Sequence, residues 1–273
     1  MDLSQILEIT SATDPGMVRS HNEDSIASDP ANGLVVLADG MGGYNAGEVA
    51  SGMATTVITT EIAQVLSNVQ PYDIGEDGSI LATRIVREQI LKANSSIYQA
   101  AQNQAQYSGM GTTLIVSLLY DNKVMVGHLG DSRVYRMRGG DFTQVTRDHS
   151  LLQEQIDSGL ITAEQAKTAA HKNLVTKALG IDPTVEPEMH EYDALVGDIY
   201  LLCSDGLCDM VSDEDIGMTL SMLGGNLKLA TQQLVQMAND NGGRDNVSVI
   251  LVRVLKEYPA ARGVMSKFFA WLK

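Results

Sequence analysis

The sequence predicts an α+β protein in which helices and sheets are stacked in layers. Six short apolar runs rich in β-branched residues have the length of strands, and tight turns such as YDNK and RGGD separate neighbouring runs. Strands joined by such turns indicate antiparallel meanders rather than repeated βαβ units. Three longer segments with helical periodicity are grouped between the strands, and this grouping favours a layered sandwich.

The predicted strands lie at 33–38, 112–120, 123–130, 133–139, 198–203 and 246–254. The first predicted helix follows Gly47 and the second begins near Ser79, where one stripe holds Ala82, Val86, Ile90, Ala93 and Ile97. A third helix is predicted over 226–240, ending at an NGG stop signal. Residues 149–187 interrupt the strands with a short helical pattern and a polar stretch, which predicts a surface flap.

Length and composition indicate an ordinary globular protein. The chain has 273 residues, 44% of them hydrophobic, and we expect one domain over 1–258 followed by a short basic and aromatic extension at 259–273. We expect that extension to pack on the domain itself, with membrane or partner binding as the alternative. The net charge of -15 argues against nucleic-acid binding.

The cellular setting is read from the cysteines and from the apolar segments. Cys203 and Cys208 are the only cysteines, which excludes a disulfide scaffold and leaves a zinc site without its second pair. No apolar stretch reads as long enough to span a bilayer, and the first residues lack the pattern of a signal peptide. We therefore expect a cytoplasmic protein without a transmembrane segment, and a monomer.

Aspartates at strand ends are the most informative feature. Asp39, Asp131 and Asp205 follow predicted strands, Asp245 precedes one, and Asp24 lies upstream in RSHNED. A single Asp-Gly is most often a β-turn. Several carboxylates at the edge of one core repel one another unless cations neutralise them. Hard divalent cations such as Mg²⁺ or Mn²⁺ prefer such oxygen ligands, so the set together predicts a metal cluster.

Arg19 lies four residues before Glu23 and five before Asp24. Its planar guanidinium is suited to hold phosphate oxygens by paired hydrogen bonds, and a surface salt bridge is the alternative. Two hard metal ions that share a carboxylate lower the pKa of a bridging water. The residues thus favour a metal-activated water beside an arginine suited to phosphate.

Seven motifs occur in an order that resembles the metal-dependent protein serine/threonine phosphatases of the 2C type, in their bacterial form: RSHNED, ADGMGG, GEVAS, GTT, GDSRVY, CSDGLCD and GGRDNVSVI. The resemblance extends from about Thr10 to Val254. It implies a four-layer α-β-β-α sandwich of two antiparallel sheets flanked by helices. It also implies phosphorylated proteins as substrates and a cognate serine/threonine kinase, or another signalling protein, as a partner.

The resemblance implies a set of metal ligands made of carboxylates and one carbonyl: Asp24, Asp39, Gly40, Asp131, Asp205 and Asp245. Asp39 would bridge two ions, and Asp205 with Asp245 would complete one of them. The Gly40 carbonyl would bind the other ion, supported by Asp24 through water. In bacterial members Asp131 joins Asp205 at a third, weaker site.

The remaining implied roles concern the substrate and the surroundings of the ligands. Arg19 matches the arginine that binds the substrate phosphate, Glu23 would support the ligands from outside, and Asn246 would fix the local loop. His171, in the expected flap, is a candidate for substrate access, with a surface histidine as the alternative. Met41 stands where eukaryotic members carry a histidine proposed as the general acid, and a thioether donates no proton.

The expected mechanism is direct attack on phosphorus by a metal-bridging hydroxide, without a phosphoenzyme. One rival is a phosphatase with an aspartate nucleophile, whose chemistry usually uses a D-x-D loop in a parallel doubly wound sheet. The other rival is a non-catalytic phosphoprotein-binding pseudo-phosphatase. A trapped phosphorylated aspartate would favour the first rival, and absence of Mn²⁺-dependent turnover would favour the second.

Overall fold

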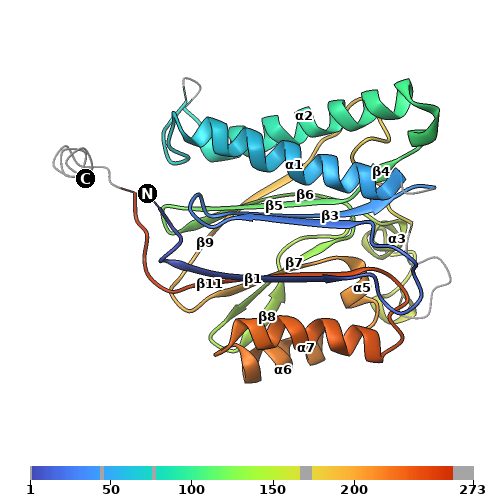
Figure 1. Ribbon diagram of the computed structural model, residues 1–273. Helices are drawn as coiled ribbons and strands as arrows, with labels where there is room; N and C mark the ends of the chain where they lie inside the picture. Colours follow the sequence, from blue (N-terminus) through green and yellow to red (C-terminus); the bar gives the residue numbers. More distant parts are fainter. Residues whose placement is uncertain (1, 44–45, 76–77, 167–173, 261–273) are drawn as a thin grey trace.

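The computed structural model is a four-layer sandwich, with helices outside and two sheets inside (Figure 1). It describes residues 2–43, 46–75, 78–166 and 174–260. One helical layer contains α1 (Ala46–Leu66) and α2 (Leu81–Asn103), and the other contains α6 (Asp213–Leu223) and α7 (Leu227–Asp240). The shorter helices are η1 (Ala105–Tyr107), α3 (Leu151–Asp157), α4 (Ala163–Ala166) and α5 (Asp205–Cys208).

Both sheets are antiparallel. The first contains, in spatial order, β1 (Leu7–Asp14), β11 (Val247–Val254), β10 (Ile199–Cys203), β7 (Arg133–Arg138) and β8 (Asp141–Gln144). The second contains β2 (Asp24–Asp29), β3 (Leu34–Met41), β5 (Leu114–Tyr120), β6 (Lys123–Leu129) and β9 (Glu188–Asp193), while β4 (Gly111–Thr112) pairs with β3. The predicted α+β sandwich is confirmed, and the doubly wound parallel sheet of the first rival is wrong for this chain.

The outer helices form because each has an apolar face to bury. The five residues of the stripe predicted for α2 are all fully buried: Ala82, Val86, Ile90, Ala93 and Ile97. α1 is the one described helix that is long and apolar enough, by length and composition, to cross a membrane. The expectation that no stretch reaches that length therefore has this exception. Since Ala50, Ala54, Ile58 and Ile62 of α1 are fully buried in the same core as α2, we interpret α1 as a core helix.

Alternation along the strands divides the interior into three apolar layers. In β3, Leu34, Val36 and Ala38 belong to the core under α1 and α2, whereas Val35 and Leu37 belong to the core between the sheets. In β10, Leu201 faces the core under α6 and α7, and Leu202 faces the other sheet. Each central strand is thus buried on both faces, which explains its continuous apolar run.

Two connections cross from one sheet to the other at the same end of the sandwich. Residues 15–23 join β1 to β2, and residues 130–132 join β6 to β7. The helix α5 lies at this end (Figure 1). The crossing end therefore gathers loops from both sheets around the edge of the core.

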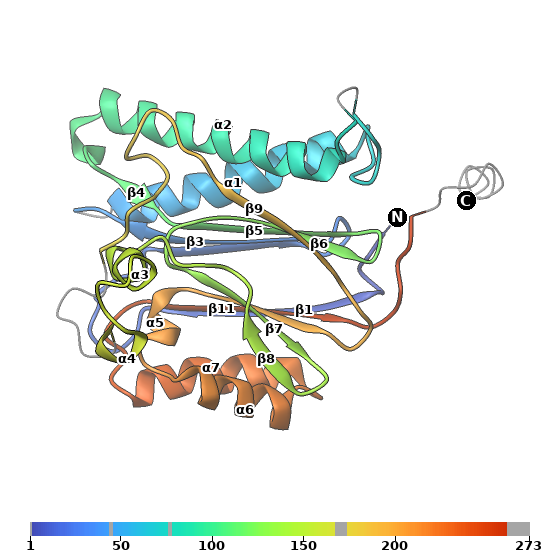
Figure 2. The same ribbon diagram turned by 180° about the vertical axis from the view of Figure 1, so that it is seen from behind.

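Several elements were not predicted. The strands β1, β2 and β9 are largely half-exposed, with polar residues at many positions, so they lack a strong apolar signal. The segment 149–187 contains α3 and α4 and connects β8 to β9 (Figure 2). His171 lies outside the described residues, as do residues 261–273 of the expected C-terminal extension.

Candidate metal centre

The centre begins at two aspartates that face each other across neighbouring strands. Asp24 opens β2 and pairs in register with Asp39 near the end of β3. Asp39 lies two residues beyond Leu37, so alternation directs its side chain toward the space between the sheets. Two carboxylates placed directly opposite each other repel, and the pairing needs a compensating charge.

The two carboxylate oxygens of Asp24 differ in their hydrogen bonding. The Ser204 hydroxyl donates to Oδ2 at 2.9 Å, whereas Oδ1 is buried and has no hydrogen-bond partner among the described residues. Burial raises the pKa of Asp24 to about 6. A buried carboxylate oxygen without a donor fits a site built for a cation.

Asp39 shows that the predicted carboxylates come together. Burial raises its pKa well above the ordinary value, and four further carboxylates raise it in the order Asp24, Asp205, Asp131 and Asp245. Its backbone is fixed on both sides, because its N–H donates to the Thr113 hydroxyl at 3.1 Å and its carbonyl accepts from the Thr113 N–H at 2.8 Å. The backbone of Asp39 is therefore held in place where its side chain is buried amid like charges.

Asp131 and Asp205 meet from two different elements. Asp131 lies in the turn that crosses from β6 to β7 and is buried, and burial raises its pKa to about 6. Asp205 opens α5 directly after β10, and its pKa is raised well above the ordinary value by burial and by the charges of Asp131 and Asp209. Both line a cavity of about 370 Å³ whose other wall includes Leu152 and Gln153 of α3.

Arg19 and Asp245 lie on adjoining loops at the rim. The guanidinium donates to Asp245 Oδ2 at 2.7 Å, and half of the Arg19 side chain remains exposed to solvent. Asn246 fastens these loops together: its amide donates to the carbonyls of Pro15 and His21, each at 3.0 Å, and its Oδ1 accepts from the Glu23 N–H at 2.8 Å. The structure thus gives Asn246 contacts suited to the loop-fixing role that the sequence predicts.

Gly40 lies where no side chain fits. A Cβ atom at this position would approach the Gly47 carbonyl oxygen to 2.2 Å and the Glu23 carbonyl oxygen to 2.5 Å. The Glu23 Oε1 atom is itself buried without a hydrogen-bond partner in the described part of the chain. Glycine is required at position 40 because the ADGMGG turn packs directly against the loop that carries Glu23.

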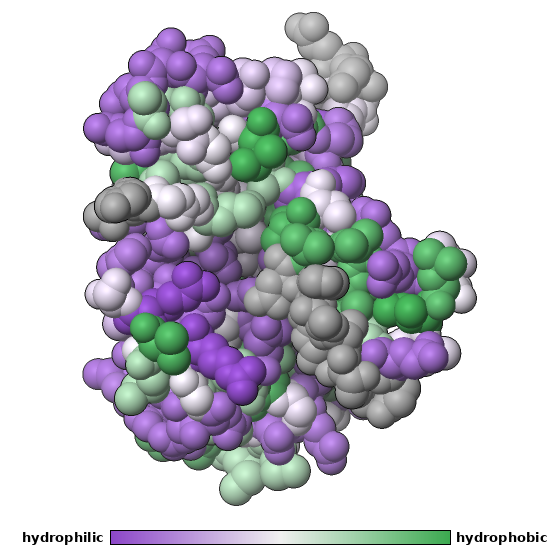
Figure 3. Space-filling model, turned by 90° about the vertical axis from the view of Figure 1, so that its right-hand side faces the viewer, coloured by the Kyte–Doolittle hydropathy of each residue, from purple (hydrophilic) through white to green (hydrophobic). Residues whose placement is uncertain are grey.

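The donor set fits hard divalent cations. The groups that would hold them are the carboxylates of Asp24, Asp39, Asp131, Asp205 and Asp245 and the carbonyl of Gly40, all of them oxygen donors. Mg²⁺ and Mn²⁺ prefer such shells, whereas zinc usually takes nitrogen or sulfur. Hydrophilic residues gather on the face at this end of the molecule (Figure 3). The assignment of each ligand remains a prediction.

Two residues that support the centre were missed by the sequence analysis. Ser204 bonds Asp24, and Thr113 bonds the backbone of Asp39. Their side chains continue the alternation of apolar residues that face the other sheet. Ser204 lies two residues after Leu202, and Thr113 lies two residues before Ile115. Extending each strand's alternation past its apolar run gives the signal that finds them.

Comparison with known proteins identifies the family that has this fold. The family model described as Protein phosphatase 2C matches residues 18–252. The serine/threonine protein phosphatase PstP of Mycobacterium tuberculosis (strain H37Rv) is 36% identical over 250 residues, covering 92% of this chain and 45% of PstP. Protein phosphatase PhpP of Streptococcus pneumoniae (strain R6) is 35% identical over 256 residues, covering 92% of this chain and 99% of PhpP.

Solved structures agree with these relatives. A crystal structure of the Mycobacterium tuberculosis phosphatase PstP/Ppp has a TM-score of 0.82 at 36% identity, covering 92% of this chain and 100% of that chain. The catalytic domain of PstP in complex with 2 manganese ions has a TM-score of 0.79 at 35% identity, covering 92% and 99%. The chain belongs to the protein phosphatase 2C family, as its motifs predict. It spans less than half of the length of PstP.

Proposed function

We propose that this chain is a protein serine/threonine phosphatase that hydrolyses phosphoserine and phosphothreonine with two Mn²⁺ or Mg²⁺ ions and a weaker third. The family and the manganese-bound relative support the activity and the two ions. When bound, the ions neutralise the carboxylates and activate water for attack on phosphorus. The third ion is proposed at Asp131 and Asp205, which line the cavity beside α3.

One observation carries the proposal: Asp39 is buried among four other carboxylates that raise its pKa. Such a cluster of carboxylates requires cations to neutralise it. Asp39 is followed by Gly40 and Met41, so it lacks the D-x-D loop typical of an aspartate nucleophile, and its sheet is antiparallel rather than parallel. This favours direct attack by water over a covalent aspartyl-phosphate. Asp39 then serves to position cations.

Arg19 would bind the substrate phosphate. Its partner Asp245 is a predicted metal ligand, and the exposed half of the guanidinium points to a role at the open rim of the centre. Phosphate oxygens accept paired hydrogen bonds from such a fork. Met41 ends β3 beside the centre and has no proton to donate, so we propose no side chain as general acid.

The wider role is also proposed. We infer that the substrates are proteins phosphorylated by a bacterial serine/threonine kinase, as the resemblance of the motifs implies. The similar protein PstP is named a serine/threonine protein phosphatase, which supports phosphoprotein substrates. We further propose a cytoplasmic location. The free thiols of Cys203 and Cys208 support it, since cytoplasmic proteins keep cysteines reduced.

Turnover of p-nitrophenyl phosphate and of a phosphothreonine peptide tests the proposal. We expect hydrolysis with Mn²⁺ and its loss with EDTA. Asp39→Asn should lower the rate at saturating Mn²⁺ by at least about a hundredfold, because metal ions supply several kcal/mol of transition-state stabilisation. The exposed Asp240→Asn is the matched control and should retain full activity.

Three results would contradict the proposal. Full activity of Asp39→Asn would remove the metal-positioning role. A trapped phosphorylated aspartate would replace direct attack with a covalent mechanism. Phosphopeptide binding and metal binding without any turnover would identify a pseudo-phosphatase.

A further inference from the structure

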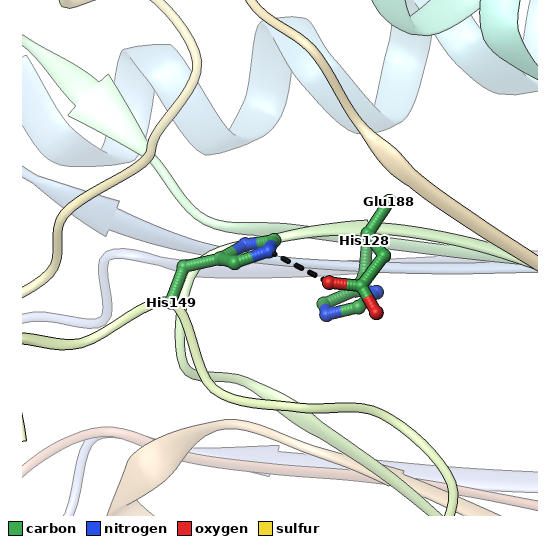
Figure 4. Close-up of side chains that lie close together, drawn as sticks. All are labelled: His128, His149 and Glu188. Atoms are coloured by element: carbon green, nitrogen blue, oxygen red, sulfur yellow. Dashed lines mark hydrogen bonds and ion pairs between the residues drawn. The ribbon is translucent and has the colours of Figure 1, made fainter. Parts of the chain in front are cut away.

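Two histidines and a glutamate, His128, His149 and Glu188, form a cluster (Figure 4). The cluster lies beside the turn that carries Asp131, because His149 contacts Gly130. His128 on β6 pairs in register with Glu188 on β9, and His149 follows β8 where the flap segment begins. Both histidines are buried, and Glu188 is half-buried. The proposed hydrolysis uses none of these three residues.

The geometry of the cluster fits a hydrogen-bonded support better than a metal site. Ligand-type atoms of the three side chains lie within 4.8 Å of one another. The two imidazole rings are stacked, with centroids 4.8 Å apart and planes 3° from parallel. A histidine binds a metal ion in the plane of its own ring, and stacked parallel rings share no such point. Both nitrogens of His149 also have partners already.

The hydrogen bonds fix the tautomer of His149. The Gly130 N–H donates to Nδ1 at 3.2 Å, so that nitrogen carries a lone pair and the ring proton lies on Nε2. Nε2 then donates to Glu188 Oε2 at 3.1 Å. Burial lowers the pKa of His149, which keeps the ring neutral. The other carboxylate oxygen of Glu188 lies 2.5 Å from His190 Nε2 and is thereby oriented.

His149 joins the turn at Gly130 to the start of the flap segment and to Thr176 within it. Besides the bond to Nδ1, the His149 N–H donates to the Gly130 carbonyl at 2.9 Å. The His149 carbonyl accepts from the Thr176 N–H at 2.8 Å, where the chain returns from the flap. The next residue, Ser150, caps the N-terminus of α3. His128 contacts Arg147, which lies two residues before His149. The His128 Nε2 atom is 2.9 Å from the Arg147 carbonyl oxygen.

Gly130 transmits this constraint to the metal centre. It directly precedes Asp131 and has φ of +104°, a conformation that favours glycine. A Cβ atom at Gly130 would lie 2.6 Å from the side chain of Thr113, so the turn packs tightly on that residue. Thr113 in turn bonds the backbone of Asp39. A shift of this turn would therefore affect two predicted metal ligands, Asp131 directly and Asp39 through Thr113.

We propose that His149, in the tautomer selected by Glu188, is a positioning residue that holds the Gly130–Asp131 turn against the flap segment and so sets the Asp131 carboxylate for its metal ion. The consequence for the metal rests on the proposed function. The hydrogen bonds to Gly130 stand without it.

Two matched variants test the hydrogen bonds of the two His149 ring nitrogens separately. In His149→Asn the amide oxygen takes the place of Nδ1 and can accept from Gly130, whereas in His149→Gln the amide nitrogen takes the place of Nε2 and can donate to Glu188. Hydrogen exchange of the Gly130 amide is read by NMR, and the weakest Mn²⁺ affinity is read by electron paramagnetic resonance. We expect His149→Gln to lose protection at Gly130 and to bind the weakest Mn²⁺ about tenfold less tightly, as loss of one buried hydrogen bond implies. In His149→Asn, the exchange rate of the Gly130 amide and the weakest Mn²⁺ affinity should each stay within about threefold of wild type.

An Asp131→Asn background shows whether His149 acts through Asp131. In that background His149→Gln should cause no further loss of Mn²⁺ affinity, because the ligand being positioned is already gone. An equal loss in both backgrounds, or unchanged Gly130 exchange in folded His149→Gln, would overturn the proposal. Normal Mn²⁺ binding and the expected variant effects without any turnover would count against the proposed function alone.

Discussion

Asn246 provides a quantitative test of how the rim of the centre is held. This side chain is buried and makes three hydrogen bonds, with the N–H of Glu23 and the carbonyls of Pro15 and His21. Asn246→Ala removes all three. At about 1 kcal/mol for each net hydrogen bond, the free energy of unfolding should fall by about 3 kcal/mol. Because these bonds fasten the loop that carries Arg19, the KM for a phosphopeptide should rise about tenfold.

Urea unfolding and steady-state kinetics measure the two effects separately. Asn241→Ala is the matched control, since among the described residues this exposed amide makes one hydrogen bond, to the Met210 carbonyl at 2.8 Å. It should lower the free energy of unfolding by about 1 kcal/mol or less and leave KM unchanged. If Asn246→Ala behaved like this control, the three bonds would not hold the rim and the reasoning would fail.

Three further predictions follow from the centre. Arg19→Ala should raise KM about tenfold but change the free energy of unfolding by less than about 1 kcal/mol, because its pair with Asp245 is exposed; kinetics and urea unfolding check both. Metal-free protein should lose stability as pH rises from about 4 to 6. The folded state holds protons on Asp24 and Asp131, with pKa of about 6, more tightly than the unfolded chain does. Thermal melts in EDTA would show a flat profile if this were wrong. Gly130→Ala should lower the free energy of unfolding by about 2 kcal/mol or more, because Gly130 has a φ of +104° that alanine rarely adopts. Urea unfolding measures this, and an unchanged midpoint would contradict it.

Most of the fold was predictable because its central elements carry strong patterns. The stripe on α2 and the apolar runs of β3, β5, β6, β10 and β11 are buried as their periodicity requires. The YDNK turn was also predictable from the sequence. Its residues Asp121 and Asn122 adopt the positive φ values of 47° and 57° that a tight hairpin turn needs.

The missed strands show where local patterns fail. β2 reads DSIASD, and most of its residues are half-exposed, so no run of apolar residues marks it. It forms because β3 offers it a partner edge and because Ile26 can pack between the sheets. Such a strand is specified by its neighbour more than by its own sequence. For the same reason the sequence indicated Asp24 by its motif without showing that it lies opposite Asp39.

The metal centre continues the packing of the core with different side chains. Along β2, β3 and β10, the residues that face the opposite sheet are Ile26, Leu37 and Leu202. Two positions further toward the crossing end, the same alternation places Asp24, Asp39 and Ser204. The strands therefore need no bend or bulge to bring Asp24, Asp39 and Ser204 together, because the register that packs the core also aligns its polar edge. A one-residue slip of β3 would turn both Leu37 and Asp39 toward α1 and leave Ala38 or Gly40 at the centre. Burial of Leu37 between the sheets therefore also maintains the position of Asp39.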